Sequence, residues 1–427
     1  MKLEVLISKT EKISGLVKVP PSKSYTHRAI IASALSDGTS KIFSPLFSDD
    51  TLATINACKS LGVPIVEANG CLEVKGGKLK QPKNPINCRL SAATLRFMTA
   101  VASLVEGKTV LTGEEGLLKR PIGPLVKALN QLGIHCEARG EYPPVTVYGG
   151  SLNGGEASIV GDVSSQFISG LLFVTPLAKN NSKIVLTSQL ESKPYVQLTL
   201  EVLRKHGVNV KVLGDHEGYV TNGNQKYKPY NHRVPGDFSS ASFLMAAAAI
   251  TGSKIRLKNL DVQTRKQPDI EILDILEKMG VKIVLEEDCV TVEGGKLEGI
   301  SLDAKNIPDL VPISVVLACY AEGETKIKNV RRLRIKESDR VEAITSELVK
   351  MGGKILKLEN ELIVEGVGRL KGATINPHKD HRIAMACAVA ALGAEGKTKI
   401  LDAECVKKSY PNFFQDLKSL GGKIVFV

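Results

Sequence analysis

The sequence predicts an α/β (α+β) protein of two domains, each built from three copies of one repeated unit with buried helices inside. The main observation is a helix that ends at a Gly and is followed by a short strand. This pattern recurs about every 70 residues, which is the kind of internal period that sets the architecture of a chain. The marker glycines are Gly62, Gly133, Gly207, Gly280, Gly352 and Gly421. Two further observations are an apolar helix in each copy and a polar cluster where that helix starts.

The fourth copy shows the elements of the unit most clearly. Residues 269–279 carry apolar side chains at helical spacing, which indicates an amphipathic helix. Gly280 suits the left-handed position that follows the end of a helix. Strands are predicted over 281–285 and 289–292, with a turn between them.

A second helix precedes each amphipathic one and is apolar almost all round, which is typical of a helix inside the core. The six segments are 29–35, 95–105, 167–178, 241–250, 311–320 and 383–392. None approaches the roughly 20 residues of a membrane span, so no membrane association is expected.

The last copy ends at Val427 after a single strand, and residues 2–7 look like the strand that it lacks. We therefore expect the N-terminal strand to complete the last copy. One domain then covers residues 21–233 with copies 1–3, and the other covers 1–20 plus 234–427 with copies 4–6. Both crossings between the domains carry Pro, as a stiff linker would.

Composition agrees with this organisation and indicates a cytoplasmic protein. A chain of 427 residues suggests two or three domains. Its first residues alternate like a strand, so no signal peptide is expected. The 8 cysteines show no Cys-x-x-Cys spacing and are interpreted as small buried residues in a reducing compartment.

The net charge of +12 has two explanations, nucleic acid or small polyanionic substrates. Runs of Lys and Arg are short, and aromatic residues make up only 4%, so platforms for base stacking are scarce. The positions of the basic residues favour small anions. A helix start binds anions because its N–H groups are unpaired and its dipole is positive there.

Cations recur at predicted helix starts, where they oppose the helix dipole and therefore need an anion or a carboxylate nearby. They are Arg28, Arg120, Lys336, Arg340, Arg382 and Lys408. One such residue is usually a solvated surface charge, but six in the same place favour anion binding. Lys23 and Ser24 lie in the first turn of the first buried helix, and Lys336 and Arg340 are expected four residues apart on the fifth amphipathic helix. Pro121 is expected in the first turn after Arg120.

Other polar residues at helix starts have a simpler interpretation as caps. Ser22, Ser239 and Asp380 are predicted to cap their helices, and Asp49–Asp50 to combine capping with solvation. Glycine pairs such as Gly294–Gly295 follow strands and open no helix, so they are turns rather than phosphate loops. No set of His, Cys and carboxylates has metal-binding spacing, and no metal is expected.

Eight short motifs stand in one order along the chain and resemble those of the 5-enolpyruvylshikimate-3-phosphate synthase family. They are Pro-Ser-Lys-Ser-x-Thr-x-Arg at 21–28, Lys-Arg-Pro-Ile-Gly at 119–123, Ser-Ser-Gln-Phe at 164–167, Ser-Lys-Pro-Tyr at 192–195, Ile-Pro-Asp at 307–309, Lys-Glu-Ser-Asp-Arg at 336–340, Asp-His-Arg-x-Ala-Met at 380–385 and Lys-Ser-Tyr-Pro at 408–411. The resemblance implies two domains of three βαβαββ units each, an inside-out α/β barrel, which close over the substrates.

The resemblance also implies an activity, transfer of the enolpyruvyl group of phosphoenolpyruvate to the 5-hydroxyl of shikimate 3-phosphate. Phosphate is released through a tetrahedral ketal intermediate, on the shikimate pathway to chorismate and the aromatic amino acids. The expected partners are these two small molecules, with no nucleic acid and no membrane. No metal or organic cofactor is implied, and the expected state is a monomer.

Roles carried over by matching position are as follows. Phosphoenolpyruvate is expected to meet Lys23, Ala92, Arg120, Gln166, Arg340, Arg382 and Lys408. Shikimate 3-phosphate is expected to meet Lys23, Ser24, Arg28, Ser164, Ser165, Gln166, Ser192, Tyr195, Asp309, Arg332 and Lys336. Asp309 is the candidate base for the 5-hydroxyl, Glu337 the candidate donor of the methylene proton, and Lys23 the residue that assists the leaving phosphate.

Two alternatives remain open at this point. The sister family transfers enolpyruvyl to UDP-N-acetylglucosamine and usually carries a reactive Cys, but residues 112–124 contain none. The motif at 336–340 also belongs to the shikimate branch. A non-catalytic anion-binding or nucleic-acid-binding protein would explain the charge, but it would leave Asp309 and Glu337 without a purpose.

The chain departs from the family pattern at Leu90, Ala92, Ala93 and Arg332. Ala92 replaces a Gly of the phosphoenolpyruvate pocket, and Arg332 stands where the family often has Asn.

Ala92 predicts weak inhibition by glyphosate, which inhibits the family at the phosphoenolpyruvate site and is bulkier at one end. The extra methyl group should cost the inhibitor about 1–3 kcal/mol more than the substrate, because a close-packed site cannot absorb it. Ala92→Gly should therefore tighten glyphosate about tenfold or more. Inhibition constants for both proteins test this. Potent inhibition of the wild type, or no gain in the variant, would show that Ala92 does not control the pocket.

Overall fold

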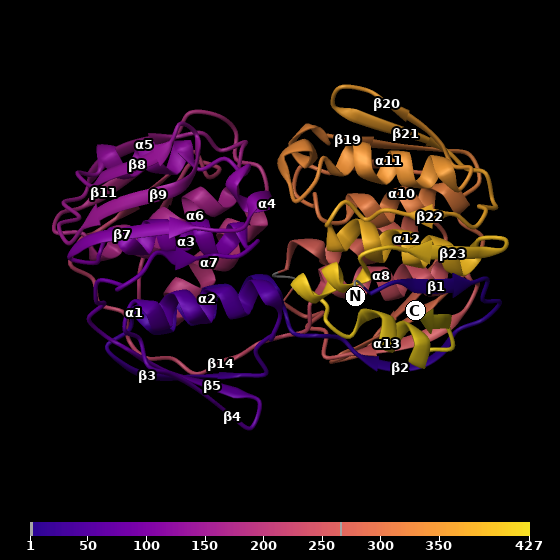
Figure 1. Ribbon diagram of the computed structural model, residues 1–427, viewed down its shortest axis with the longest axis horizontal. Helices are drawn as coiled ribbons and strands as arrows, with labels where there is room; N and C mark the ends of the chain where they lie inside the picture. Colours follow the sequence, from indigo (N-terminus) through magenta and orange to yellow (C-terminus); the bar gives the residue numbers. More distant parts are fainter. Residues whose placement is uncertain (1–2, 265–266) are drawn as a thin grey trace. The chain divides into compact units, whose positions relative to one another are not determined.

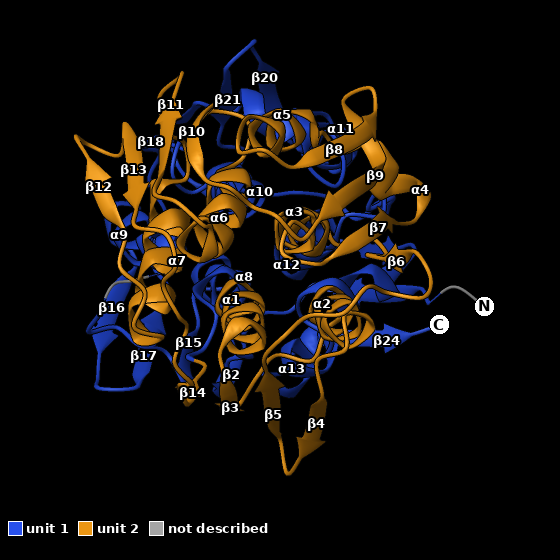
Figure 2. Cartoon of the chain, turned by 90° about the vertical axis from the view of Figure 1, so that its left-hand side faces the viewer, with its two compact units in different colours: residues 1–21, 235–427 blue, residues 22–234 orange. Residues whose placement is uncertain are grey.

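The computed structural model describes residues 3–264 and 267–427, and the chain divides into two compact units. Unit 1 comprises Met1–Pro21 and Pro235–Val427, and unit 2 comprises Ser22–Val234 (Figure 2). Both crossings lie one residue from the positions predicted from the sequence. Each unit has a hydrophobic core of its own.

Unit 2 contains copies 1–3 (Figure 1). Its helices are α1 (Lys23–Leu35), α2 (Asp49–Ser60), α3 (Ala92–Ala102), α4 (Glu115–Leu118), α5 (Gly123–Gln131), α6 (Ser165–Val174) and α7 (Lys193–Lys205). Its strands are β3 (Gly38–Phe43), β4 (Ile65–Ala68), β5 (Cys71–Gly76), β6 (Ile86–Asn87), β7 (Gly107–Thr112), β8 (His135–Arg139), β9 (Tyr142–Gly149), β10 (Gly155–Ile159), β11 (Ser182–Leu186), β12 (Lys211–Leu213), β13 (Gly218–Thr221) and β14 (His232–Arg233).

Unit 1 contains copies 4–6. Its helices are α8 (Phe238–Ile250), α9 (Ile272–Lys278), α10 (Val311–Tyr320), α11 (Arg340–Lys350), α12 (His381–Gly393) and α13 (Phe413–Ser419). Its strands are β1 (Val5–Ser8), β2 (Ser14–Lys18), β15 (Lys254–Lys258), β16 (Lys282–Leu285), β17 (Cys289–Glu293), β18 (Ser301–Asp303), β19 (Glu324–Lys328), β20 (Lys354–Lys357), β21 (Glu361–Glu365), β22 (Thr374–Ile375), β23 (Lys397–Ile400) and β24 (Lys423–Phe426). Short 3₁₀ turns, at Pro268–Glu271, Arg331–Ile335 and Ala403–Lys408, precede α9, α11 and α13.

All six sheets have four strands and one topology, which confirms the βαβαββ unit. In the third copy, β10 pairs in parallel with β11 across the buried helix α6. The hairpin of β12 and β13 then joins the sheet through an antiparallel pairing of β13 with β11. The described strands form separate sheets, so hydrogen bonds close no barrel. In Figure 2 the sheets of unit 2 stand around α1 and α3, which are seen nearly end on.

Three of the sheets are completed by strands that are distant in the sequence from the rest of the sheet. As predicted, β1 lies between β23 and β24 and supplies the strand that the last copy lacks. Two further closures were not predicted. The edge strand of copy 1 is β14, which pairs in parallel with β3, and the edge strand of copy 4 is β2, which pairs in parallel with β15. Each strand stays in the unit of its partner: β14 is the last strand of unit 2 before the chain crosses to unit 1, and β2 is the last strand of unit 1 before the chain crosses to unit 2.

The helices with apolar sequences are buried along almost their whole length. All residues of α8 from Phe238 to Ala249 are buried, and so are those of α12 from His381 to Leu392. An entirely apolar surface can be placed only inside a core, so sheets and amphipathic helices cover these helices. Their polar groups are therefore concentrated at their ends.

Glycines occupy two special positions in the unit. The six marker glycines have φ between 76° and 107°, the left-handed region in which a Cβ is strained, which confirms their place after the amphipathic helices. Gly294 lies against the carbonyl oxygens of Ala248 and Ala249 at the end of α8, where a Cβ would collide with them. This glycine pair is therefore a close approach of backbones and not a phosphate loop, as predicted.

A chain of buried and partly buried hydrogen bonds connects α1, the end of α7 and β14 in unit 2. Nδ1 of His206 lies 2.7 Å from the carbonyl oxygen of Lys228, and its Nε2 lies 2.8 Å from Nε2 of His232. The hydroxyl of Tyr25 lies 3.1 Å from Nδ1 of His232 and accepts a hydrogen bond of 2.8 Å from Lys205.

The direction of every bond in this chain follows from one end. A carbonyl oxygen only accepts, so His206 donates from Nδ1 and, being neutral, accepts at Nε2. His232 must then donate from Nε2 and accept the Tyr25 hydroxyl at Nδ1. Burial lowers the pKa of His206 to about 4, and burial with the neighbouring His206 and Lys205 lowers the pKa of His232 to about 3. These lowered pKa values keep both rings neutral at neutral pH, so the two facing Nε2 atoms share a single proton.

These hydrogen bonds predict that unit 2 loses stability as the pH falls below 6.5. A histidine whose pKa is lower in the folded state than in the unfolded state stabilises the fold fully at a pH above its unfolded pKa. This contribution is lost as the pH falls from the unfolded pKa to the folded pKa. The loss should reach about 3 kcal/mol for each of the two histidines by pH 4, since one pKa unit is 1.36 kcal/mol. Urea titrations followed by tyrosine fluorescence suit the test, because the chain has no Trp and 7 of its 9 Tyr lie in unit 2.

The comparison uses a variant with His206→Gln and His232→Gln, whose side chains do not titrate. Its free energy of unfolding should fall less between pH 6.5 and 4 than that of the wild type. The control is His135→Gln, since the His135 side chain is 63% exposed and pairs with Glu137 at the surface. Equal slopes in the wild type and the double variant would contradict the prediction.

Candidate active site

In unit 1, Arg382 joins the starts of three buried helices. It is the second residue of α12, and its Nη1 donates to the hydroxyl of Ser239 in α8 over 2.5 Å. Its Nη2 donates to Oδ2 of Asp309, two residues before α10, over 2.9 Å. The three helix starts, with their N–H groups and dipoles, therefore meet around one guanidinium group.

Arg340, the first residue of α11, is surrounded by three carboxylates although its side chain is only 1% exposed. Its nitrogens lie 2.7 Å from Oδ1 of Asp309, 2.7 Å from Oε2 of Glu337 and 2.8 Å from Oδ2 of Asp380. This is the neutralisation expected for a cation at a helix start. Asp309 thus bridges Arg340 and Arg382, one through each carboxylate oxygen.

These cations keep Asp309 ionised. Burial alone would raise the pKa of Asp309, but Arg382, Arg340 and Lys336 outweigh it and hold that pKa far below its usual range. For Arg340, burial alone would lower the pKa, but Asp380, Glu337 and Asp309 raise it. The buried centre of unit 1 is therefore a network of full charges.

Glu337 lies between two cations of the same network. Besides Arg340, it contacts Lys408, whose Nζ is 3.3 Å from Oε1 of Glu337. Lys408 is 6% exposed and ends the 3₁₀ turn that precedes α13. Arg340 thus brings together Asp309 and Glu337, two carboxylates that could act as general acid or base.

Two details of this cluster correct the sequence predictions. Ser239 is not the cap of α8: Asp237 caps it by accepting from the backbone N–H of Ser239 over 3.1 Å, which leaves the Ser239 hydroxyl for Arg382. Lys336 lies outside α11, because Asp339 caps that helix and Arg340 begins it. Lys336 and Arg340 therefore do not share one helix face.

The structure confirms the predicted cap at Asp380 and gives the position of Arg332. Asp380 caps α12 by accepting from the N–H of Arg382 over 2.9 Å, as predicted. Arg332 lies in the 3₁₀ turn before α11, is 6% exposed, and donates to the carbonyl oxygen of Lys305 over 3.0 Å. Arg332 is therefore held in a defined place.

In unit 2, the start of α1 carries a buried ion pair that the sequence did not reveal. Nζ of Lys23, the first residue of α1, lies 2.9 Å from Oδ2 of Asp50. Asp50 is 4% exposed, so its interpretation as a partly solvated cap is wrong. Ser48 caps α2 instead, in a capping box with Thr51. Ser22 caps α1, as predicted.

Arg28 connects the starts of α1 and α7. It donates to the carbonyl oxygen of Ser24 over 2.9 Å, to that of Tyr195 over 3.0 Å and to the hydroxyl of Thr199 over 2.7 Å. Burial lowers the pKa of Arg28 to about 10, so it stays charged at neutral pH. In the described part of the chain no carboxylate lies within ion-pair distance of Arg28, which leaves its charge for an anion.

Arg96 is the residue at this site that sequence reasoning missed. It lies in α3, is 4% exposed, and donates to the Ser164 hydroxyl over 3.0 Å and to Oε1 of Gln166 over 2.9 Å. It also donates to the carbonyl oxygen of Pro121 over 3.3 Å. A charged residue inside an otherwise apolar helix was the available signal, because a buried cation must be neutralised or fully hydrogen-bonded.

Most of the remaining candidate residues of unit 2 also lie at helix starts, and Arg120 is the exception. Ser164 caps α6 and Ser165 begins it, and Ser192 precedes α7 in the left-handed conformation, with φ of 55°. Ala92 begins α3 and is 6% exposed. Arg120 is also 6% exposed, but α5 begins at Gly123 with Pro124 in its first turn, so the prediction for Pro121 is wrong.

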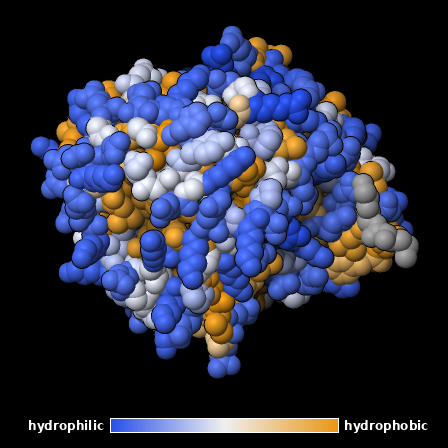
Figure 3. Space-filling view, turned by 60° about the vertical axis from the view of Figure 1, so that its left-hand side comes forward, coloured by the Kyte–Doolittle hydropathy of each residue, from blue (hydrophilic) through white to orange (hydrophobic). Residues whose placement is uncertain are grey.

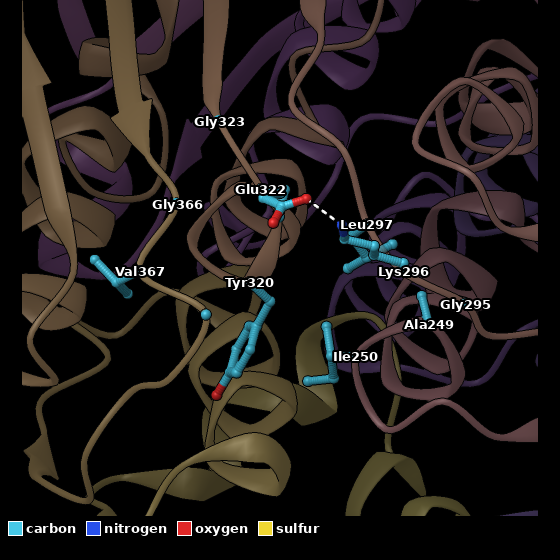
Figure 4. Close-up of a pocket in the computed structure, with 12 residues that line it drawn as sticks. Ala249, Ile250, Gly295, Lys296, Leu297, Tyr320, Glu322, Gly323, Gly366 and Val367 are labelled. Carbon is cyan, nitrogen blue, oxygen red and sulfur yellow. Dashed lines mark ion pairs between the residues drawn. The ribbon is translucent and has the colours of Figure 1, made fainter.

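Figure 4 shows a cavity of about 460 Å³ in unit 1 that contains none of these residues. It is lined by the ends of α8 and α10, at Ile250 and Tyr320, and by an ion pair of Lys296 with Glu322. The charged cluster lies at the starts of the same helices. The cavity is therefore separate from the candidate active site.

Residues 3–264 and 267–427 contain no group of three or more His, Cys, Asp or Glu side chains placed to hold a metal ion. Within the same ranges, no helix has the length and apolar character needed to cross a membrane. Hydrophilic side chains cover most of the face drawn in Figure 3.

Comparison with known proteins gives the family. The family model described as EPSP synthase (3-phosphoshikimate 1-carboxyvinyltransferase) matches residues 7–417. The chain belongs to the EPSP synthase family. The resemblance drawn from the eight motifs is thereby confirmed.

Relatives and solved structures agree with the EPSP synthase family. The 3-phosphoshikimate 1-carboxyvinyltransferase of Methanocella arvoryzae is 47% identical over 98% of this chain and 99% of its own length. That of Methanocaldococcus jannaschii is 44% identical with the same coverage. The EPSP synthase structure from Acinetobacter baumannii has a TM-score of 0.84 at 28% identity and covers all of both chains. The enolpyruvyl transferase NikO from Streptomyces tendae shares the fold, with a TM-score of 0.83 at 18% identity.

The charge network predicts that Arg340→Met destabilises unit 1 by about 3–5 kcal/mol at pH 7, because three carboxylates would lose a common buried partner. The loss should shrink as the pH is lowered, since the carboxyl groups can then take up protons. The free energy of unfolding from urea titrations followed by circular dichroism tests this.

The matched control is Arg334→Met, the same substitution at an exposed pair. Arg334 contacts Asp339 over 3.1 Å with side chains 35% and 37% exposed, so its loss should cost less than about 1 kcal/mol. A similar loss of unfolding free energy in the two variants would contradict a stabilising role for the ion pairs of Arg340.

Proposed function

We propose that this chain transfers the enolpyruvyl group of phosphoenolpyruvate to the 5-hydroxyl of shikimate 3-phosphate and releases phosphate. Family membership and relatives named 3-phosphoshikimate 1-carboxyvinyltransferase support the proposal. The observation that carries it is the geometry of Asp309 and Glu337, two carboxylates held by one guanidinium group among further cations. The product leads to chorismate and the aromatic amino acids.

The cations of both units are assigned to the two anionic substrates. Phosphoenolpyruvate is assigned to Arg340, Arg382 and Lys408 of unit 1 and to Lys23, Ala92, Arg120 and Gln166 of unit 2. Shikimate 3-phosphate is assigned to Ser24, Arg28, Ser164, Ser165, Ser192 and Tyr195 of unit 2, to Asp309, Arg332 and Lys336 of unit 1, and also to Lys23 and Gln166. Arg96 is a positioning residue, because it holds Ser164 and Gln166.

Substrate binding changes the carboxylates as well as neutralising the cations. An anion that takes hydrogen bonds from Arg340 and Arg382 does so in competition with Asp309 and Glu337. Each carboxylate then loses part of its cationic neighbourhood and sits in a drier, more negative site, so its pKa rises. Asp309, a weak base while two guanidinium groups hold it, becomes a stronger base when phosphoenolpyruvate arrives.

The proton balance assigns opposite roles to the two carboxyl groups. In the addition, Asp309 takes the proton of the 5-hydroxyl, whose oxygen bonds to C2 of phosphoenolpyruvate, while a protonated Glu337 gives its proton to the methylene carbon. In the elimination, Glu337 takes a proton back from the methyl group, the bond from C2 to the phosphate oxygen breaks, and Asp309 returns its proton to the phosphate. Lys23 assists the leaving phosphate as a cation.

We also assign the protein to the cytoplasm as a monomer without a cofactor. The cysteines support a reducing compartment, since all 8 are free and 6 are buried. Family membership does not favour the two alternatives that the sequence left open, transfer to UDP-N-acetylglucosamine and a non-catalytic anion-binding role. Phosphate release from phosphoenolpyruvate with shikimate 3-phosphate, with UDP-N-acetylglucosamine or with neither separates the three.

The mechanism predicts that Asp309→Asn and Glu337→Gln each lower turnover at least about 100-fold, the usual scale for a general acid or base. Both substitutions keep the shape of the side chain, so the variants should fold. Phosphate release at saturating substrates measures the effect, with circular dichroism as the control for folding. Near wild-type turnover in either variant would remove that residue from the mechanism.

A further inference from the structure

The buried carboxylate of Glu347 in unit 1 takes no part in the mechanism above. Glu347 lies in α11, seven residues after Arg340, and both residues are on the buried face of that helix. Its side chain is only 1% exposed. Burial of a carboxylate is unfavourable unless charged groups or hydrogen bonds compensate for the lost water. The groups that contact Glu347 therefore show what this side chain does.

Glu347 accepts hydrogen bonds from its own helix and from one loop. Nζ of Lys350, one turn further along α11, lies 2.8 Å from Oε1 and 2.7 Å from Oε2 of Glu347. Nε2 of His378 lies 2.9 Å from Oε1, and it donates because a carboxylate only accepts. The backbone N–H of Asn376 donates to Oε2 over 3.0 Å. Each oxygen of Glu347 thus holds one group of the loop that follows β22.

This loop contains two consecutive residues in the left-handed conformation. The angle φ is 53° at His378 and 58° at Lys379. Neither residue is a glycine, so the Cβ of each is strained in this conformation. Such strain persists only where the surrounding contacts hold the backbone. Here the contacts of Asn376 and His378 with Glu347 hold it, together with a hydrogen bond of 2.9 Å from the N–H of His378 to Oδ1 of Asn376.

The strained residues lead directly into Asp380, which belongs to the charge network. The N–H of Asp380 donates to the carbonyl oxygen of Pro377 over 2.8 Å. Its carboxylate caps α12 at the N–H of Arg382 and accepts from Nε of Arg340 over 2.8 Å. The loop is therefore attached to α11 at two points, Glu347 and Arg340, and the left-handed residues lie between the two attachments.

We propose that Glu347 is a positioning residue that fixes Asp380 by holding the strained loop. Asp380 in turn places Arg340 and Arg382 for phosphoenolpyruvate. Without the contacts of Glu347 the left-handed residues would relax, and the relaxation would displace the carboxylate on which both arginines depend. The inference rests on the proposed function, because it concerns the binding of that substrate.

The test compares the kinetic constants of the wild type with those of Glu347→Gln. An amide nitrogen cannot accept a hydrogen bond, so one loop contact is lost whichever oxygen it replaces. The KM for phosphoenolpyruvate should rise about tenfold, the effect of losing one hydrogen bond to a charged group. The KM for shikimate 3-phosphate should stay near its wild-type value, because Arg340 and Arg382 are assigned to the other substrate. A general loss of packing would affect both substrates alike.

A second substitution, at Lys379, provides a rescue that a general packing role does not predict. Lys379→Gly removes the strain of the left-handed backbone, so adding it to Glu347→Gln should restore most of the affinity for phosphoenolpyruvate. The matched control adds Lys379→Ala, which loses the same charge but keeps a Cβ and should restore nothing. Glu342→Gln is the control for the first substitution, because Glu342 lies on the same helix but pairs with Lys357 at the surface. It should keep the wild-type KM.

Amide hydrogen exchange examines the loop without any substrate. The peptide that contains residues 376–382 should exchange faster in Glu347→Gln than in the wild type, and the added Lys379→Gly should slow it again. His378→Ala is a second variant in case Glu347→Gln does not fold, since the His378 side chain is 39% exposed. It removes one loop contact and keeps the strain, so it too should speed exchange and raise the KM for phosphoenolpyruvate.

The proposal would be overturned by a wild-type KM for phosphoenolpyruvate in Glu347→Gln, or by equal rises in both KM values. A rescue by Lys379→Ala as complete as that by Lys379→Gly would also overturn it. Failure to release phosphate with shikimate 3-phosphate would refute the proposed function instead. Hydrogen exchange would then still show whether Glu347 holds the loop.

Discussion

The apolar surface of the buried helices is the constraint on which the rest of the structure depends. Helices such as α8 and α12 bury nearly every residue, so polar chemistry is possible only at their ends. Their starts present N–H groups and positive dipole ends, which attract anions. In unit 1 three such starts meet at Arg382, and in unit 2 Arg96 joins α3 to the start of α6. The site follows from how the core is built.

The carboxylates of the network have two opposed roles. Cations placed at helix starts against the dipole must be neutralised, and Asp309, Glu337 and Asp380 do this for Arg340. The same ion pairs keep Asp309 from acting as a strong base. Stability of the resting site and reactivity toward the substrates therefore depend on the same bonds, and an anion that exchanges partners with the carboxylates shifts the balance from one to the other.

Much of the fold could be predicted because its signals are local. The spacing of Gly62 and its five counterparts, the apolar helices and the N-terminal strand all follow from short patterns. Contacts between distant residues could not be predicted. The two-residue strand β14 is too short to leave a pattern, Asp237 and Ser239 are equally plausible caps, and the pairing of Lys23 with Asp50 exists only once α1 and α2 are packed. The chemical roles of site residues came from the family resemblance, since no spacing rule assigns them.

The strands β1 and β14, which pair with strands distant in the sequence, also set the order in which the chain can fold during synthesis. Unit 2 has all its strands once residue 234 has left the ribosome, because β14 closes the first sheet of that unit. Strands of unit 1 lie on both sides of unit 2 in the sequence, and β1 can pair only after β23 and β24 have been made. The nascent chain must therefore keep its first strands unpaired while a whole domain folds between them and their partners.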